Sequence, residues 1–305
     1  MQNVGTPRFY IDSGLYQYTI GAWTPEADQV SLVQLNPTNS VSKPANNIVV
    51  PRISPIKYIA FLGHNGGSFS PAFNPSASRD DFEEIINMSG TDGDELYTGF
   101  SIATFTDMED ATGLEGVIES SNSTIGAVSI GDYYDIQSPD LSLKLTYEYD
   151  GVKNIQTKGG ATLSNASYYK PANWGNMGAW QLGTANTPNP SNLRSGRRVW
   201  DLSFSYLSDE SLMPNLGVQN YEDDGTGGIV TTEDILSGTD FFSVVWNRTM
   251  GGHLPFIFNP NGADGTGQNN SPDQFAICRF VGKSLQYNQI APNTYNVKLK
   301  IRETW

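Results

Sequence analysis

The 305-residue sequence has little cysteine and histidine. Its single cysteine, Cys278, excludes an intrachain disulfide framework and any cysteine-rich metal site. Because Cys278 lies in the apolar run from Phe275 to Phe280, we expect a buried, inert thiol. The two histidines, His64 and His253, could hold a metal only by converging with distant carboxylates, so we favour a structural role for both. The sequence therefore predicts no metal and no cofactor.

Long apolar runs and positive charge are also scarce. No window approaches the roughly 18 apolar residues of a membrane span, and an N-terminus carrying Arg8 and Asp12 lacks the order of a signal peptide. We expect a soluble protein made in a cytoplasm. The net charge of −14 argues against a nucleic-acid partner, because that affinity rests on clustered cations. For the only basic cluster (Arg194, Arg197 and Arg198), a solvated strand start or an ion-pair site is favoured over a nucleic-acid contact.

The residues that are abundant predict an all-β fold with a few short helices. Thirty-one glycines, 17 prolines and 11% aromatic residues are typical of short strands joined by many turns. The run from Trp200 to Tyr206 alternates apolar and polar residues, as does the run from Tyr295 to Arg302, so both are predicted to be half-buried antiparallel strands. A closed or sandwiched β unit would bury the aromatic residues between them.

Local patterns place further elements along the chain. Strands are expected at 8–12, 16–20, 30–35, 48–50, 98–106 and 125–131, and another at 56–65, where it runs into a Gly-Gly loop. The period-two run from Leu141 to Tyr149 is predicted to form a hairpin with 152–157 through the turn Asp150-Gly151. A helix is expected at 80–87, with Ser78 as its cap, and two more are expected near 233–236 and over 239–247.

Four segments carry a resemblance to a known group of proteins. They are WDLSFSYLS (200–208), FFSVVWNRTMGGHLPFIFNP (241–260), DQFAICRF (273–280) and YNVKLKIRETW (295–305). In this order they resemble the C-terminal part of virion structural proteins of marine tailed phages, including T4-like cyanophages, and more weakly minor tail and tail-hub proteins. The resemblance extends upstream through 129–135 and 158–161. It implies a place in a virion and a role in assembly, with no catalytic signature.

Two units separated by an arm are expected. Residues 1–170 are predicted to form an N-terminal β-sandwich, in which Tyr58 to Asn65 is similar to galactose-binding-like jelly rolls of phage tail and fibre proteins. Residues 171–196, rich in Trp, Gly and Pro, are predicted to be a linker or arm. Residues 197–305 are predicted to be a β-rich, tail-hub-like domain.

The favoured function is that of a structural subunit of a tailed-phage virion, in the tail, baseplate or tail hub, and not that of an enzyme. Its partners would be other virion proteins and copies of itself, and its location the virion tail, after assembly in the host cytoplasm. The loop 262–272 is long enough to touch another subunit. Candidate interface residues are Trp174, Trp180, Arg194, Arg197, Arg198 and Trp305.

The alternatives concern ligands. The chain could be a carbohydrate-binding adhesin for host surface glycans, with Trp174 and Trp180 stacking on a sugar. Packing of these tryptophans against protein is favoured. The acidic loops at 90–95 and 222–225 could bind Ca²⁺, but neither fits the EF-hand pattern, so solvated turns are favoured. No nucleophile elbow, HExxH zinc motif or phosphate-binding loop is present, and 32 acidic residues would supply a pair of carboxylates by chance.

Overall fold

The computed structural model describes residues 4–25, 27, 29–35, 41–42, 48–49, 56–64, 69–73, 82–88, 99–105, 114–118, 124–148, 152–166, 197–214, 238–262 and 275–304. The protein is mostly β with a few short helices, which confirms the predicted fold class. The helices are α1 (Ser13–Thr19), α2 (Val30–Val33), α3 (Asp209–Leu212) and the π-helix η3 (Phe242–Asn247). The strands are β1 (Arg8–Asp12), β2 (Val41–Ser42), β3 (Ile48–Val49), β4 (Tyr58–His64), β5 (Phe69–Phe73), β6 (Phe82–Met88), β7 (Gly99–Phe105), β8 (Leu114–Ile118), β9 (Thr124–Ile125), β10 (Ala127–Asp135), β11 (Lys144–Glu148), β12 (Val152–Gln156), β13 (Thr162–Ala166), β14 (Arg197–Ser208), β15 (Phe256–Asn259), β16 (Ala276–Phe280), β17 (Tyr287–Ala291) and β18 (Thr294–Glu303).

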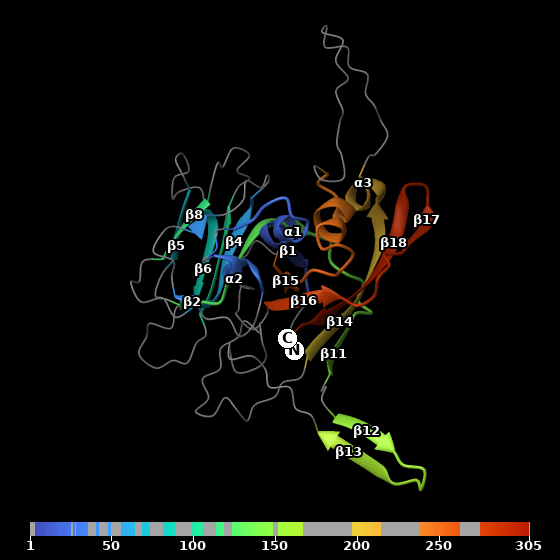
Figure 1. Ribbon diagram of the computed structural model, residues 1–305. Coiled ribbons are helices and arrows are strands. Elements are labelled where there is room, and N and C mark those ends of the chain that lie inside the picture. Colours follow the sequence, from blue (N-terminus) through green and yellow to red (C-terminus); the bar gives the residue numbers. More distant parts are fainter. Residues whose placement is uncertain are drawn as a thin grey trace.

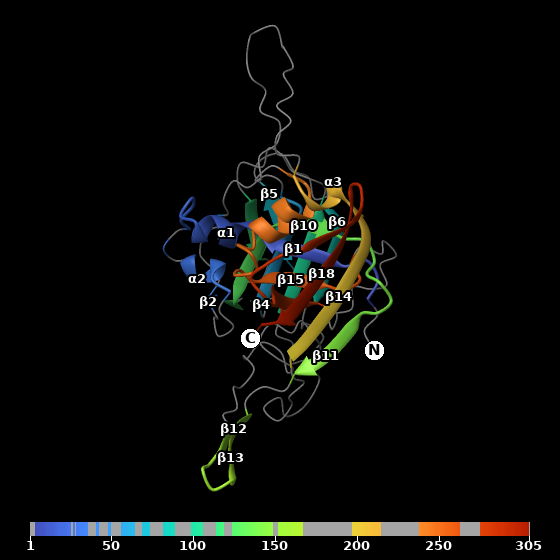
Figure 2. The same cartoon turned by 90° about the vertical axis from the view of Figure 1, so that its right-hand side faces the viewer.

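An antiparallel sheet of eleven strands organises these elements (Figures 1 and 2). Its order is β11-β14-β18-β16-β15-β1-β10-β4-β7-β6, and β17 pairs with β18. The first strand, β1, lies between β10 and β15, and β11 pairs with β14. Strands from both sides of residues 171–196 therefore share one sheet. The division into two units stays a prediction, and the arm at 171–196 lies outside the described residues.

Two apolar clusters cover opposite faces of the middle of this sheet. Along β1, Phe9 and Ile11 belong to the larger cluster and Tyr10 belongs to the smaller one. Along β15, Phe256 and Phe258 belong to the larger cluster and Ile257 belongs to the smaller one. Side chains that alternate along a strand point to opposite faces. The continuous apolar runs around β15 and β16 follow from this, because strands covered on both faces need no polar side.

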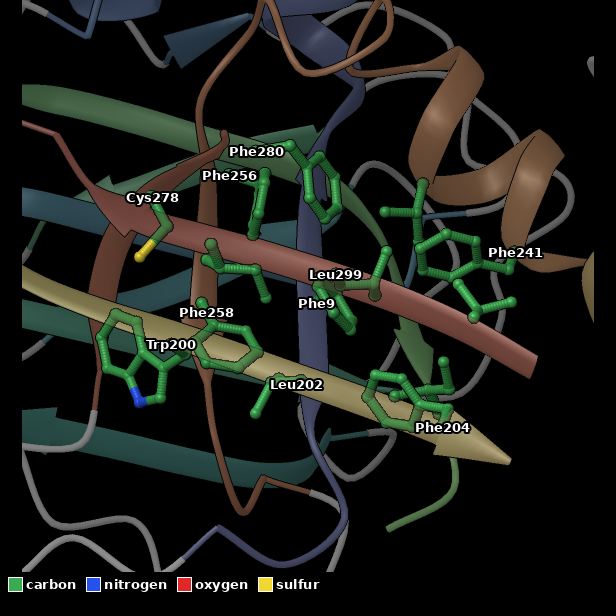
Figure 3. Close-up of a cluster of buried hydrophobic side chains, with 14 of the residues drawn as sticks. Phe9, Trp200, Leu202, Phe204, Phe241, Phe256, Phe258, Cys278, Phe280 and Leu299 are labelled. Atoms are coloured by element: carbon green, nitrogen blue, oxygen red, sulfur yellow. The ribbon is translucent and has the colours of Figure 1, made fainter. Parts of the chain in front are cut away.

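The larger cluster is built around Phe9. Its ring lies 5.2 Å from the ring of Phe258, 5.6 Å from that of Phe256 and 5.9 Å from that of Phe241, measured between centroids. Figure 3 shows these rings together with Trp200 and other residues of β14, β16 and β18. Offset and edge-to-face aromatic pairs at these separations are favourable beyond their buried area. An N-terminal strand therefore completes the core of the C-terminal half of the chain.

The two alternating runs form the long paired strands β14 and β18, with one departure. Trp200, Leu202 and Phe204 are buried as predicted, but Tyr206 is 78% exposed instead of facing the core. A β-bulge shifts the register between Phe204 and Leu207, and Tyr206 adopts a φ of 62°. An extra residue in one strand turns its neighbours to the other face. Leu207 consequently takes the buried position.

At three segments the prediction of helix or strand is wrong. The sequence predicts strands at 16–20 and 30–35, but these residues contribute to α1 and α2. Asp12 starts α1, because its carboxylate accepts a hydrogen bond from the Leu15 amide at 2.8 Å. The helix predicted at 80–87 is strand β6, whose pairing with β7 overrides the local helix signals. The helix predicted over 239–247 is confirmed as η3, and Asp240 caps it by accepting from the Ser243 amide at 3.0 Å. The helix near 233–236 lies outside the described residues.

The predicted hairpin of 141–149 with 152–157 is wrong in its pairing, although both strands exist. β11 pairs with β14, where Lys144 lies opposite Asp201 and Glu148 opposite Arg197. Opposite charges in register stabilise such a pair. β12 pairs instead with β13, through a turn in which the Thr157 amide donates to the Ala161 carbonyl at 2.8 Å. Period two identifies a strand but carries no information about its partner.

Candidate functional site

A buried charged cluster ties the first half of the chain to the second. The carboxylate of Asp132, in β10, lies 3.1 Å from Lys57 Nζ and 3.4 Å from Arg248 Nη1. The side chains of Asp132 and Arg248 are 2% and 6% exposed, whereas that of Lys57 is 27% exposed. Arg248 directly follows η3 and Lys57 directly precedes β4. One carboxylate therefore holds the end of the helix and the start of a strand against β10.

Asp12 brings a second buried carboxyl group to the same strands. Its residue is 4% exposed and lies opposite Gly131 in the β1–β10 pair. Burial raises the pKa of Asp12 to about 7, and the hydrogen bond from the Leu15 amide offsets only part of this effect. Its Oδ1 atom caps α1, while Oδ2 is buried with no hydrogen-bond partner within 3.5 Å among the described residues. The Asp12 carboxyl therefore changes its charge near neutral pH.

Tyr58 lies beside these carboxyl groups and stays protonated. Its hydroxyl is 2.8 Å from that of Ser129, and the residue is fully buried. Burial, followed by the charge of Asp12, raises the pKa of Tyr58 well above its ordinary value. The Asp132 carboxylate ties β10 to the end of η3 and to the start of β4, and the Asp12 carboxyl caps α1 at the end of β1.

A second buried ion pair joins β14 to the end of β18. Arg198 Nη2 lies 3.1 Å from Glu303 Oε1, and Arg198 Nε donates to Oε2 at 3.2 Å. The backbone amide of Arg198 also donates to Oε2 at 2.9 Å, and Nη2 donates to the Phe275 carbonyl at 3.0 Å. The guanidinium lies 5.2 Å from the ring centroid of Trp200. Both charged side chains are at most 1% exposed. Such a pair is strongly destabilising when only one partner is removed.

Cys278 is buried next to this pair, as predicted. The residue is fully buried and its thiol is free. Burial first, and then the charge of Glu303, raises the pKa of the Cys278 thiol well above its ordinary value. A thiol that stays protonated is a poor nucleophile and a poor metal ligand. The side chain acts as a small apolar residue of the core.

An exposed apolar surface lies on the β12–β13 hairpin, which projects from the rest of the protein (Figures 1 and 2). Ile155 and Leu163 lie directly opposite each other and are 52% and 60% exposed. Directly opposed residues share one face of a hairpin, so these two side chains form one patch. An isolated two-stranded hairpin is marginally stable in water. The patch is therefore a candidate contact surface.

The predicted interface residues lie only partly within the described structure. Trp174, Trp180, Arg194 and Trp305 lie outside the described residues. Arg197 is half-buried at the start of β14. Arg198 is buried against Glu303, which agrees with the ion-pair site and leaves its guanidinium with no surface for a neighbouring subunit.

The remaining predicted ligand sites are placed as follows. The segment from Tyr58 to Leu62 is buried in β4, and His253 is exposed in a turn. The acidic loops at 90–95 and 222–225, and positions 263–272 of the predicted contact loop, lie outside the described residues. Over the described ranges, no three His, Cys, Asp or Glu side chains gather to hold a metal ion. No helix in the part of the chain that the structure covers is long and apolar enough to span a bilayer.

Sequence reasoning missed two buried acidic residues and the exposed apolar pair of the hairpin. Asp12 and Asp132 end or interrupt apolar runs, which is a signal of a buried polar group, but their partners come from distant segments. Ile155 and Leu163 read as ordinary strand residues, because exposure depends on what covers a face. Comparison with protein-family models, with curated proteins and with solved structures gives no match.

Proposed function

We propose that this chain is a structural subunit of a tailed-phage virion, in the tail, baseplate or tail hub, and that it acts by binding neighbouring proteins. In this role it turns over no substrate. Its place would be the virion tail, and its partners would be other virion proteins and copies of itself. Two things support the proposal: the resemblance of four segments that form parts of the sheet and of η3, and the β12–β13 hairpin.

The hairpin is the observation that carries the assembly role. It contributes no residue to either apolar cluster, so its apolar pair adds nothing to the described core. Ile155 and Leu163 nevertheless face solvent within the β12–β13 hairpin, which projects from the rest of the protein. Single exposed apolar residues are normal on any protein, whereas this opposed pair forms a contiguous apolar patch on a projection, which favours a contact surface.

The glycan-binding alternative has less support. It depends on Trp174 and Trp180, which lie outside the described residues, and on the segment from Tyr58 to Asn65, in which Tyr58 to Leu62 are buried between β7 and β10. A buried aromatic ring offers no open face on which a sugar could stack. The alternative remains a prediction that a glycan array on the isolated protein would test.

Mass spectrometry and cryo-electron microscopy of purified phage particles test the proposed function. We expect the chain in a fixed ratio to other tail proteins, with ordered copies arranged about the tail axis. Its absence from purified particles would overturn the proposal.

A further inference from the structure

The β12–β13 hairpin combines its apolar patch with positive charge. Residues 152–166 contain two lysines, Lys153 and Lys158, and no acidic residue, in a chain whose net charge is −14. Lys158 lies in the exposed turn at the tip of the hairpin. The hairpin therefore carries the charge opposite to that of the chain as a whole. A second copy of this chain is a partner with complementary charge.

A surface that combines an exposed aromatic ring with negative charge lies at the opposite end of the protein from the hairpin (Figures 1 and 2). There the β-bulge of β14 turns Tyr206 outward, to 78% exposure. Asp209 and Glu210 follow in α3, and the segment from Tyr206 to Pro214 contains no lysine or arginine. We call Tyr206, Asp209 and Glu210 the α3 surface. Exposed tyrosines are frequent anchors of protein interfaces.

The positive φ of Tyr206 is a further reason to consider this residue. A φ of 62° is uncommon for a residue other than glycine, asparagine or aspartate. Such conformations persist where the surrounding structure holds them, and they are concentrated at functional positions. Here the side chain gains no burial within the chain in return. A partner that covers the ring would supply the missing contact.

We propose that the β12–β13 hairpin of one copy docks on the α3 surface of a second copy. Ile155 and Leu163 pack on Tyr206, and Lys158 faces Asp209 and Glu210. This inference rests on the proposed assembly function and names its partner. Because the two surfaces differ, each contact joins a hairpin of one copy to an α3 surface of another. A two-fold dimer makes this contact twice, whereas copies joined head-to-tail either close into a ring or continue as a filament.

Sedimentation velocity of the full-length protein over a concentration series tests the contact. We expect concentration-dependent association that Leu163→Asp weakens at least about tenfold in dissociation constant, equivalent to ~1.4 kcal/mol. Thr162→Asp is the matched control, because it adds the same charge at an exposed position on the other face of the hairpin. Thr162→Asp should change the dissociation constant by less than about threefold, or ~0.7 kcal/mol.

The receiving surface is tested by Tyr206→Asn. Asparagine tolerates a positive φ better than tyrosine does, so the variant should fold at least as well as the wild type. Its association should nevertheless weaken to a similar degree as that of Leu163→Asp. A carbodiimide, which joins lysine to carboxylate without a spacer, should link Lys158 to Asp209 or Glu210 between isotopically light and heavy copies.

Any one of four results would overturn the inference. They are a wild-type chain that stays monomeric throughout the series, Leu163→Asp and Thr162→Asp associating equally, Tyr206→Asn associating like wild type, or mixed-isotope cross-links that avoid the α3 surface.

These results are separable from a failure of the proposed function. If the chain is present in phage tails but the two hairpin variants associate alike, the virion role stands without this contact. If association depends on the hairpin but particles lack the chain, the contact stands and the virion role fails.

Discussion

Breaking the buried Arg198–Glu303 pair should destabilise the fold far more than breaking an exposed pair nearby. Glu303→Gln keeps the shape of the side chain but removes its charge, leaving the Arg198 guanidinium buried without a counter-ion. Removing one partner of a buried ion pair costs about 3 to 5 kcal/mol. Because natural proteins are stable by only about 5 to 15 kcal/mol, this is a large fraction of the total.

The chain contains a matched control for this substitution. Glu148 pairs with Arg302 at 3.0 Å, but their side chains are 37% and 35% exposed. Exposed ion pairs contribute about 0 to 1 kcal/mol, so Glu148→Gln should cost no more than that. The two substitutions make the same chemical change in the same sheet, on strands β18 and β11. Burial is the main variable that distinguishes them.

Urea denaturation, followed by tryptophan fluorescence, measures both effects. With a slope of about 3 kcal/mol per molar urea, Glu303→Gln should lower the midpoint by roughly 1 to 1.7 M, and Glu148→Gln by no more than about 0.3 M. Joining Arg198→Met with Glu303→Leu should restore most of the loss, because an apolar pair of similar volume leaves no buried charge. Equal midpoints for Glu303→Gln and Glu148→Gln would refute the reasoning and show that water reaches the buried pair.

Four further predictions concern other parts of the fold. Because the pKa of Asp12 is about 7 in the folded protein and about 3.9 in an unfolded chain, its contribution to stability is complete below pH 4 and is lost as the pH rises to about 7. Asp12→Asn keeps the cap and should remove up to roughly 4 kcal/mol of this pH dependence, measured by urea denaturation between pH 4 and pH 8. Gly131→Ala should lower stability by about 1 to 3 kcal/mol in the same assay, because its Cβ would collide with the Ile11 carbonyl oxygen; a variant as stable as wild type would contradict the close approach of β1 to β10 at this position. Phe9→Ala should cost about 3 to 5 kcal/mol, and a loss below about 1 kcal/mol would mean that β1 does not complete the core. Cys278 should react with a thiol reagent only as fast as the protein unfolds, and fast labelling of native protein would show that the thiol is accessible.

The fold class and much of the core could be predicted from the sequence because both depend on local pattern. Alternation along 200–206 and 295–302 identifies strands and, up to Phe204, the face that each side chain takes. The apolar surroundings of Cys278 identify a buried thiol. These signals are reliable because period two and apolar content reflect burial directly.

The pairing partner of a strand, and whether a short segment forms a helix or a strand, were less predictable. The strand from Leu141 pairs with a neighbour that its own pattern does not indicate, and β6 carries the local signals of a helix. At Tyr206 the alternation fails because one inserted residue reverses every following face. In each case the deciding interaction is a hydrogen-bonded partner that is remote in the sequence.

The sequence by itself determined a mostly β protein with a net negative charge, a single inert thiol and long alternating strands. Only the tertiary structure decided that β1 lies between β15 and β10, that Asp132 meets Arg248, and that Arg198 pairs with Glu303 inside the chain. It also decided that Ile155 and Leu163 face solvent on a projecting hairpin. The physical reason is that a residue pattern fixes what a segment can bury or expose, whereas the contacts between distant segments fix what is buried and what remains open to a partner.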